Sequence, residues 1–130
     1  MHPFRQAVEA RDLQAVDALL ADDVVFTSPV AFRPYEGKPI TSAILATVIE
    51  VFEDFHYVRE IGEAGASDHA LVFEATVAGK ALTGCDFIHT DADGLIDDLM
   101  VMVRPLSAAH ALAEQMGARF EDIARRAAGG

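Results

Sequence analysis

The spacing of apolar residues changes once along the chain, and this change constrains the fold more than any other feature. Before Phe55, apolar side chains recur at steps of three and four, which is the period of a helix. From Phe55 onward the period is two, and turn-forming residues fall at 62–68, 78–80 and 91–94. The sequence therefore predicts helices followed by an antiparallel meander of strands, which is an α+β fold.

Three helices are expected before the meander. Pro3 can begin the first, because its missing N–H would be unpaired in the first turn of any helix. Asp12 has the side chain of an N-cap and precedes the second helix, which we expect to end at Asp22–Asp23. Pro39 begins the third, whose apolar stripe continues to Phe52.

A short strand and a loop connect the second and third helices. Val24–Thr27 is β-branched and aromatic, and Pro29 ends it by removing a backbone donor. The segment from Pro29 to Gly37, with two prolines and a glycine, is a loop. After the meander, Ser107 is expected to cap a final helix whose apolar residues repeat at steps of three and four as far as Ala124.

The last strand of the meander is apolar on both faces. Every residue of Leu99–Val103 is apolar, whereas residues 73–77 alternate as a strand with one buried face does. A chain of 130 residues has few elements left to cover a second face. We therefore expect a homodimer with Met100, Met102 and Phe87 in the contact, and ordinary core packing is the alternative.

The balance of charge excludes several kinds of partner. The 130 residues contain 10 Lys and Arg against 21 Asp and Glu, which gives a formal net charge of -11. Such a field repels phosphate backbones, so neither nucleic acid nor an anionic membrane surface is an expected partner. Length and the absence of a linker predict one domain over residues 1–130. The chain lacks an apolar run of about 20 residues and a secretory signal pattern, so we expect a soluble, cytoplasmic protein.

Cysteine and histidine give no indication of a metal site or a cofactor. The one cysteine, Cys85, cannot form an internal disulfide or a thiolate zinc cluster, and we interpret it as a small buried side chain. The five histidines lack H-x-H or H-E-x-x-H spacing, and no phosphate-binding loop or nucleotide fingerprint occurs. His56 and His89 lie in predicted strands, but His89 has the opposite strand parity to Asp86 and is expected to face away from it.

The order of the elements and three pairs of segments carry a resemblance to a known family. The segments are Ala10-Arg11-Asp12-Leu13 with Leu20–Val24, Ser28-Pro29 with Glu36-Gly37, and Cys85-Asp86-Phe87 with Asp93–Ile96. Over nearly its whole length the chain resembles the SnoaL-like branch of the nuclear-transport-factor-2-like superfamily. The resemblance implies a cone, in which a curved antiparallel sheet wraps around the N-terminal helices, a C-terminal helix follows, and an apolar pocket lies inside. It also implies dimerisation through the outer face of the sheet.

Asp86 is the strongest candidate for a functional residue. It lies in the middle of a predicted strand, and by the period of two it shares a face with Leu82, Gly84 and Ile88. In the ketosteroid isomerases that the chain resembles, the corresponding strand carries a protonated aspartic acid that donates a hydrogen bond to the substrate oxyanion. This resemblance implies that Asp86 points into the pocket, where burial would raise its pKa and allow it to donate at neutral pH. An outward-facing or helix-capping acid is the alternative.

Three positions depart from the related enzymes. Ser28 stands before Pro29, where the isomerases have their aspartate base, and an unactivated hydroxyl is a poor base. Phe4 stands about where they have the tyrosine of the oxyanion hole. Gly84, two residues before Asp86, stands where the limonene-type epoxide hydrolases have an arginine. Steroid isomerisation by the known mechanism and epoxide hydrolysis are therefore disfavoured.

Two functions remain open. In the first, the chain is a cofactor-independent isomerase or cyclase that acts next to the carbonyl of a small apolar compound, with Asp86 as acid, base or hydrogen-bond donor. In the second, which the missing base and tyrosine favour, it is a non-catalytic ligand-binding or dimerisation domain. The expected ligand-binding residues are Phe26, Ser28, Tyr35, Tyr57, Phe73, Leu99 and Val101. Tyr35 could instead be a solvated loop residue, and Tyr57 a half-buried residue of its strand.

Overall fold

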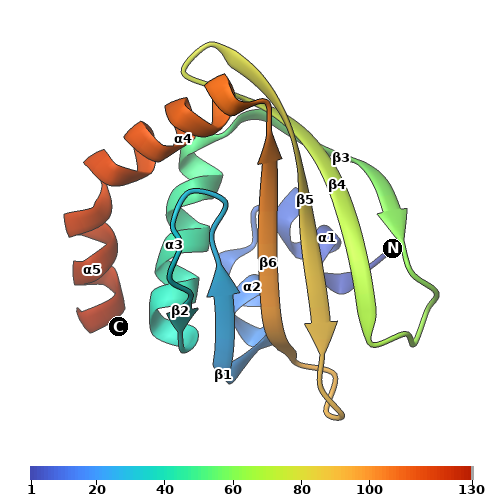
Figure 1. Ribbon diagram of the computed structural model, residues 1–130. Helices are drawn as coiled ribbons and strands as arrows, with labels where there is room; N and C mark the ends of the chain where they lie inside the picture. Colours follow the sequence, from blue (N-terminus) through green and yellow to red (C-terminus); the bar gives the residue numbers. More distant parts are fainter. Residues whose placement is uncertain (130) are drawn as a thin grey trace.

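A curved sheet with helices packed against one face is the main feature of the computed structural model, which describes residues 1–129 (Figure 1). The described part contains five helices, α1 (Pro3–Glu9), α2 (Leu13–Leu19), α3 (Lys38–Val51), α4 (Leu106–Ala118) and α5 (Phe120–Gly129). It contains six strands, β1 (Leu20–Thr27), β2 (Tyr35–Glu36), β3 (Glu53–Ile61), β4 (Asp68–Val77), β5 (Lys80–Thr90) and β6 (Ile96–Arg104). The predicted α+β fold, with helices first and a meander after them, is confirmed.

Local sequence signals explain where the first three helices begin. Pro3 is the first residue of α1. Asp12 is the N-cap of α2, as predicted, because its Oδ1 accepts a hydrogen bond from the Ala15 amide at 3.1 Å. α3 starts directly after Gly37, whose φ of 103° lies in a region that favours glycine, and Pro39 lies in its first turn.

The second helix is shorter, and the first strand longer, than the sequence predicts. α2 ends at Leu19 rather than at Asp22–Asp23, and β1 begins at Leu20 rather than at Val24. Leu20 pairs with Ile96 of β6, and it is only 1% exposed. Burial within the sheet therefore determines the conformation of this segment, against the helical spacing of its apolar residues.

The C-terminal helix begins earlier than predicted and is divided into two. α4 begins at Leu106 with Pro105 in the N-cap position, so the predicted cap Ser107 lies inside the first turn. Arg119, with a φ of -107°, separates α4 from α5. Within residues 1–129, no helix is both long enough and apolar enough to span a membrane.

The strands form one sheet in the order β2-β1-β6-β5-β4-β3. Strands β3 to β6 pair antiparallel, as a meander does. β1 and β6 instead pair in parallel, so the sheet is mixed and not wholly antiparallel as expected. The reason is the long connection through α3 and the meander, which returns the chain beside β1 in the same direction.

The two faces of the sheet differ in what covers them. On the face toward the helices, Phe73, Ile88 and Leu99 are each at most 2% exposed. The opposite face leaves Phe87 37% exposed and Met102 52% exposed. β6 is therefore apolar on both faces although only one of them packs in the core, and the other face is exposed to solvent.

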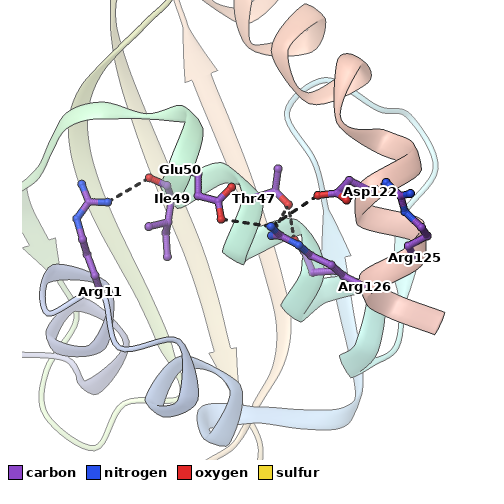
Figure 2. A network of polar contacts seen from close by, with 8 residues as sticks. Arg11, Thr47, Ile49, Glu50, Asp122, Arg125 and Arg126 are labelled. Atoms are coloured by element: carbon purple, nitrogen blue, oxygen red, sulfur yellow. Dashed lines mark hydrogen bonds and ion pairs between the residues drawn. The ribbon is translucent and has the colours of Figure 1, made fainter. Parts of the chain in front are cut away.

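The C-terminal helix α5 is attached to α3 by a polar network (Figure 2). Arg126 of α5 donates hydrogen bonds to Glu50 Oε1 and Thr47 Oγ1 of α3, each at 3.3 Å. Arg11, before α2, donates to the carbonyl of Ile49 at 3.4 Å (Figure 2). Contacts from both ends of the chain thus hold α3, which contributes residues to the cavity described below.

Candidate functional site

Asp86 lies on the helix-facing side of the sheet, in the middle of β5. Its partners across the sheet are Leu71 on β4 and Val101 on β6. The residue is only 6% exposed, and its neighbours along β5 point to the opposite face. The alternative of an outward-facing acid is therefore excluded.

Tyr57 is the hydrogen-bond partner of Asp86. Its hydroxyl donates to Asp86 Oδ2 at 2.8 Å, and Tyr57 is itself 6% exposed. The two residues are 29 positions apart in the sequence and lie on β3 and β5, with β4 between them. The strand register sets Tyr57 beside Phe73, and Phe73 beside Gly84, so the phenol reaches diagonally across β4 to the carboxyl. Among residues 1–129, no group donates a hydrogen bond to the other carboxyl oxygen, Oδ1.

Burial changes the ionisation of both groups. Removal from water raises the pKa of Asp86 to about 7, and the hydrogen bond from Tyr57 acts in the opposite direction. The pKa of Tyr57 lies well above its ordinary value of 10.0, first because of burial and then because of the nearby Asp86. Near neutral pH, Tyr57 therefore keeps its proton, while both forms of Asp86 are populated. Such a carboxyl can donate or accept a proton.

A cavity of about 70 Å³ lies beside this pair. Its wall includes five of the predicted ligand-binding residues, which are Phe26, Ser28, Tyr57, Phe73 and Val101. Polar side chains contribute only at Ser28, Tyr57 and Asp86, and no Lys, Arg or His of the described residues lines the cavity. The arrangement is one phenol and one carboxyl in a wall that is otherwise almost entirely apolar.

Two of the predicted ligand-binding residues do not line this cavity. Tyr35 is half-buried on β2, where its ring lies 6.4 Å from the ring of Phe26 and 6.4 Å from that of Phe120. Leu99 is fully buried in the core and shares a face with Val101, which does reach the cavity. Tyr35 therefore packs against a wall residue, and Leu99 belongs to the solid part of the core.

Ser28 and Phe4 stand where the related isomerases have their aspartate base and their tyrosine, and neither supplies such a group to the cavity. Ser28 Oγ accepts a hydrogen bond from the Val30 amide at 3.1 Å, so this hydroxyl closes the turn after β1. Phe4 is 2% exposed, and it lines the cavity without offering a donor. The phenol of this site comes instead from Tyr57.

Several wall residues carry no distinctive sequence signal. Most are apolar residues of the helices, namely Val8, Ile44, Leu45, Val48, Leu112 and Met116. Helical periodicity predicts that they face the core, but it does not separate a cavity wall from a solid interior. Phe52 and Phe55 also line the cavity, and the close spacing of these two with Tyr57 in the sequence is the available signal for an aromatic cluster.

His89 and Cys85 lie outside the cavity. His89 faces away from Asp86, as strand parity predicts, and its Nδ1 lies 2.6 Å from Asp97 Oδ1, a contact that raises the pKa of His89. Cys85 is half-buried on the outer face rather than fully buried, because its parity is also opposite to that of Asp86. Within residues 1–129, no group of three or more His, Cys, Asp or Glu is arranged to hold a metal ion.

Comparison with known proteins identifies the family. A family model described as the SnoaL-like domain matches residues 2–99 of the chain. The chain belongs to the SnoaL-like family. No curated protein matches this SnoaL-like chain.

Solved structures agree with this assignment. The SnoaL-like chain is 44% identical to a steroid delta-isomerase from Pseudomonas aeruginosa, with a TM-score of 0.85 over 92% of this chain and 87% of that chain. It is 35% identical to an uncharacterized protein with a cystatin-like fold from Silicibacter pomeroyi DSS-3, with a TM-score of 0.88 over 95% and 86% of the two chains. An NTF2-like protein from Cytophaga hutchinsonii shares the fold at 21% identity, with a TM-score of 0.61 over 79% and 85%. The fold is therefore that of the nuclear-transport-factor-2-like proteins.

Proposed function

We propose that this chain binds a small, largely apolar carbonyl compound and acts on it without a cofactor, as an isomerase or cyclase. The observation that carries the proposal is the hydrogen bond of 2.8 Å between Tyr57 and Asp86 at the wall of an apolar cavity. The 44% identity to a steroid delta-isomerase supports a reaction of the isomerase type.

In the proposed reaction, Asp86 acts on the carbonyl oxygen. When protonated, its free Oδ1 donates a hydrogen bond to that oxygen, which binds the ligand and polarises the carbonyl group. Tyr57 holds Oδ2 and keeps the carboxyl directed at the cavity. When ionised, the same carboxyl takes a proton from the carbon next to the carbonyl, which leaves an enolate, and it then returns that proton to the enolate at another carbon. A positioned proton transfer of this kind contributes about 10²- to 10⁴-fold to a rate.

Replacement of Asp86 by asparagine is expected to preserve the fold and abolish turnover, because an amide of the same shape cannot exchange a proton. Exchange of the protons next to the carbonyl of cyclopentanone in deuterated water, followed by NMR, measures this step without knowledge of the natural substrate. The matched control is Asp98→Asn, an exposed acid on β6, which should leave the exchange rate unchanged. An Asp86→Asn protein that exchanges as fast as the wild type would remove Asp86 from the mechanism.

A non-catalytic ligand-binding pocket is the second candidate. It is favoured by Ser28 and Phe4, which replace the base and the tyrosine of related isomerases, and by the engagement of Ser28 with the Val30 amide. A pocket without a second acid-base group would bind a carbonyl ligand and release it unchanged. Binding of cyclopentanone without proton exchange above the background rate would support this candidate over the first.

We further propose that the outer face of the sheet binds a second copy of the chain. Two adjacent apolar rows cross β4, β5 and β6, one made of Val72, Cys85 and Met102 and the other of Ala70, Phe87 and Met100. A two-fold axis that lies in the interface and crosses the strands between these rows lays each row on the other row of the second copy. The same operation brings the exposed Arg104 beside the exposed Asp98 of the second copy, so opposite charges meet.

Replacement of Met102 by lysine is expected to convert the dimer into a monomer, because it places a charge in the centre of this contact. The control is Leu106→Lys, since Leu106 is 74% exposed and lies outside both rows. Sedimentation velocity at micromolar concentration separates the two states. A wild-type protein that sediments as a monomer under these conditions would contradict the proposal.

The compartment that we propose is the cytoplasm. Cys85 is the one cysteine of the chain, and it is a free, half-buried thiol. A reducing compartment keeps such a thiol from forming disulfides with other molecules.

A further inference from the structure

The size of the cavity restricts the ligand. Its volume of about 70 Å³ is roughly half of the 150 Å³ of an engineered cavity that holds benzene. A space of this size encloses a carbonyl group and a few carbons, with the rest of the ligand at the mouth. Four fused rings cannot be enclosed in this volume. A steroid, the substrate class in the name of the 44% identical protein, would therefore keep most of its rings outside the cavity and gain little from burial there.

Phe73 fills the space that a larger cavity would need. It is 1% exposed, and its ring covers Gly84, the residue that shares the inner face of β5 with Asp86. A Cβ atom at position 84 would lie 2.2 Å from Phe73 Cζ, so the ring occupies the place of a side chain at this position. The absence of a side chain at Gly84 thus leaves the space that the Phe73 ring occupies, and we call this space the seat of Phe73.

Other aromatic rings keep Phe73 in this seat. The ring centroids of Phe55, Phe52 and Tyr57 lie 4.9, 5.7 and 6.2 Å from that of Phe73. Packed aromatic rings of this kind resist displacement, because any movement of one opens a void beside the others. The ring of Phe73 is therefore a fixed part of the wall beside Asp86.

The charge of the wall restricts the ligand further. No cation among the described residues lines the cavity, so a carboxylate or phosphate ligand would be buried without a partner. An ammonium group could pair with Asp86, but it would lose its hydration in a wall that is otherwise apolar. A neutral acceptor such as a ketone oxygen has no such cost.

We propose that Phe73, seated on Gly84, is the specificity-determining residue of this site and limits its ligands to neutral carbonyl compounds with at most one small ring. This inference rests on the proposed function, since it concerns the ligand of the same Asp86 and Tyr57 pair. It predicts that a smaller side chain at position 73 admits larger ketones.

The test is an NMR titration of the full chain at pH 6 with cyclopentanone and with the steroid ketone progesterone. Wild-type protein is expected to bind cyclopentanone and not progesterone, and Phe73→Leu should bind progesterone at least 10-fold more tightly than the wild type. Phe73→Met removes the ring while keeping most of the volume, and it replaces Phe73→Leu if that variant does not fold. Phe32→Leu is the matched control, because Phe32 is 99% exposed and outside the wall, and it should bind as the wild type does.

Charged analogues test the chemical class. Cyclopentylamine and cyclopentanecarboxylate have the same ring, and each should bind the wild type at least 10-fold more weakly than cyclopentanone. Wild-type affinity for cyclopentanone should also fall at least 10-fold between pH 6 and pH 9, as Asp86 loses its proton. Asp86→Asn should bind cyclopentanone equally at both pH values, since its amide remains a donor.

The outcomes separate the inference from the function on which it rests. If progesterone binds the wild type as tightly as cyclopentanone, if an analogue with a charge binds as well, or if both Phe73 variants keep the wild-type preference, the inference is wrong. The pH dependence at Asp86 would then still support the proposed function. If no ketone binds, or if Asp86→Asn shows the same pH dependence as the wild type, the proposed function fails and the inference fails with it.

Discussion

Asp86→Asn is expected to stabilise the protein at pH 9 by about 2–4 kcal/mol and to change its stability little at pH 4. Burial raises the pKa of Asp86 to about 7 in the folded chain, from an ordinary value of 3.8. The fold therefore favours the protonated carboxyl. Its contribution to stability is complete below pH 3.8 and is lost as the pH rises through 7, because the folded state must then bury a charge. Asparagine has nearly the same shape and does not ionise, so the variant avoids this loss.

Urea unfolding of the wild type and of Asp86→Asn, followed by circular dichroism at pH 4, 6 and 9, measures the difference. Asp93→Asn is the control, since Asp93 is exposed in the turn between β5 and β6 and its replacement should leave the pH dependence of stability as it is in the wild type. Parallel curves for the wild type and Asp86→Asn from pH 4 to pH 9 would show that Asp86 ionises in the folded chain as it does in water. Such a result would also contradict its proposed role as a proton donor at neutral pH.

Residues that alternate along strands were the most predictable part of the fold. The period of two after Phe55 predicts the meander, and the same period correctly sets His89 on the face opposite to Asp86. Periodicity reports which residues share a face, and this is a local property of a strand. It does not report which strands become neighbours, so the parallel pairing of β1 with β6 has no local signal.

Elements whose conformation depends on distant contacts were predicted less well. Leu20 reads as the end of a helical stripe, but it is a strand residue because Ile96 lies beside it in the finished sheet. Ser107 has the side chain of a cap, but Pro105 already begins the turn in which it lies. In both cases tertiary packing or the neighbouring residue overrides an intrinsic preference.

The candidate site shows the same division. The position of Asp86 in the middle of a strand made it a candidate, and the resemblance to ketosteroid isomerases implied that it points inward and that Ser28 stands in place of a base. The hydrogen bond from Tyr57 could not be predicted, because it joins two strands that are separated by a third and depends on the register of both pairings. Leu99 and Val101 share a face of β6, but Val101 lines the cavity and Leu99 is buried in the core. Strand periodicity does not show how far along a strand the cavity extends.

Gly84→Ala is expected to destabilise the protein by about 1–3 kcal/mol, although alanine is ordinarily the better residue within a strand. The added Cβ would lie 2.2 Å from Cζ and 2.7 and 2.8 Å from Cε1 and Cε2 of Phe73. The Phe73 ring cannot move without disturbing the rings of Phe52, Phe55 and Tyr57 around it. The displaced ring would also enter the cavity beside Asp86, so binding of cyclopentanone should be lost together with stability.

A control glycine and a double-mutant cycle test whether contact with the Phe73 ring causes the loss of stability in Gly84→Ala. Gly117 lies in α4 with nothing within 4 Å of an added Cβ, so Gly117→Ala should stabilise the protein, by about 0.5–1 kcal/mol. If the seat explains the cost at position 84, Gly84→Ala should be less damaging in a Phe73→Leu background than in the wild type, because the shorter side chain leaves room for the Cβ. Additive effects of the two substitutions in urea unfolding would show that Gly84 is required for another reason.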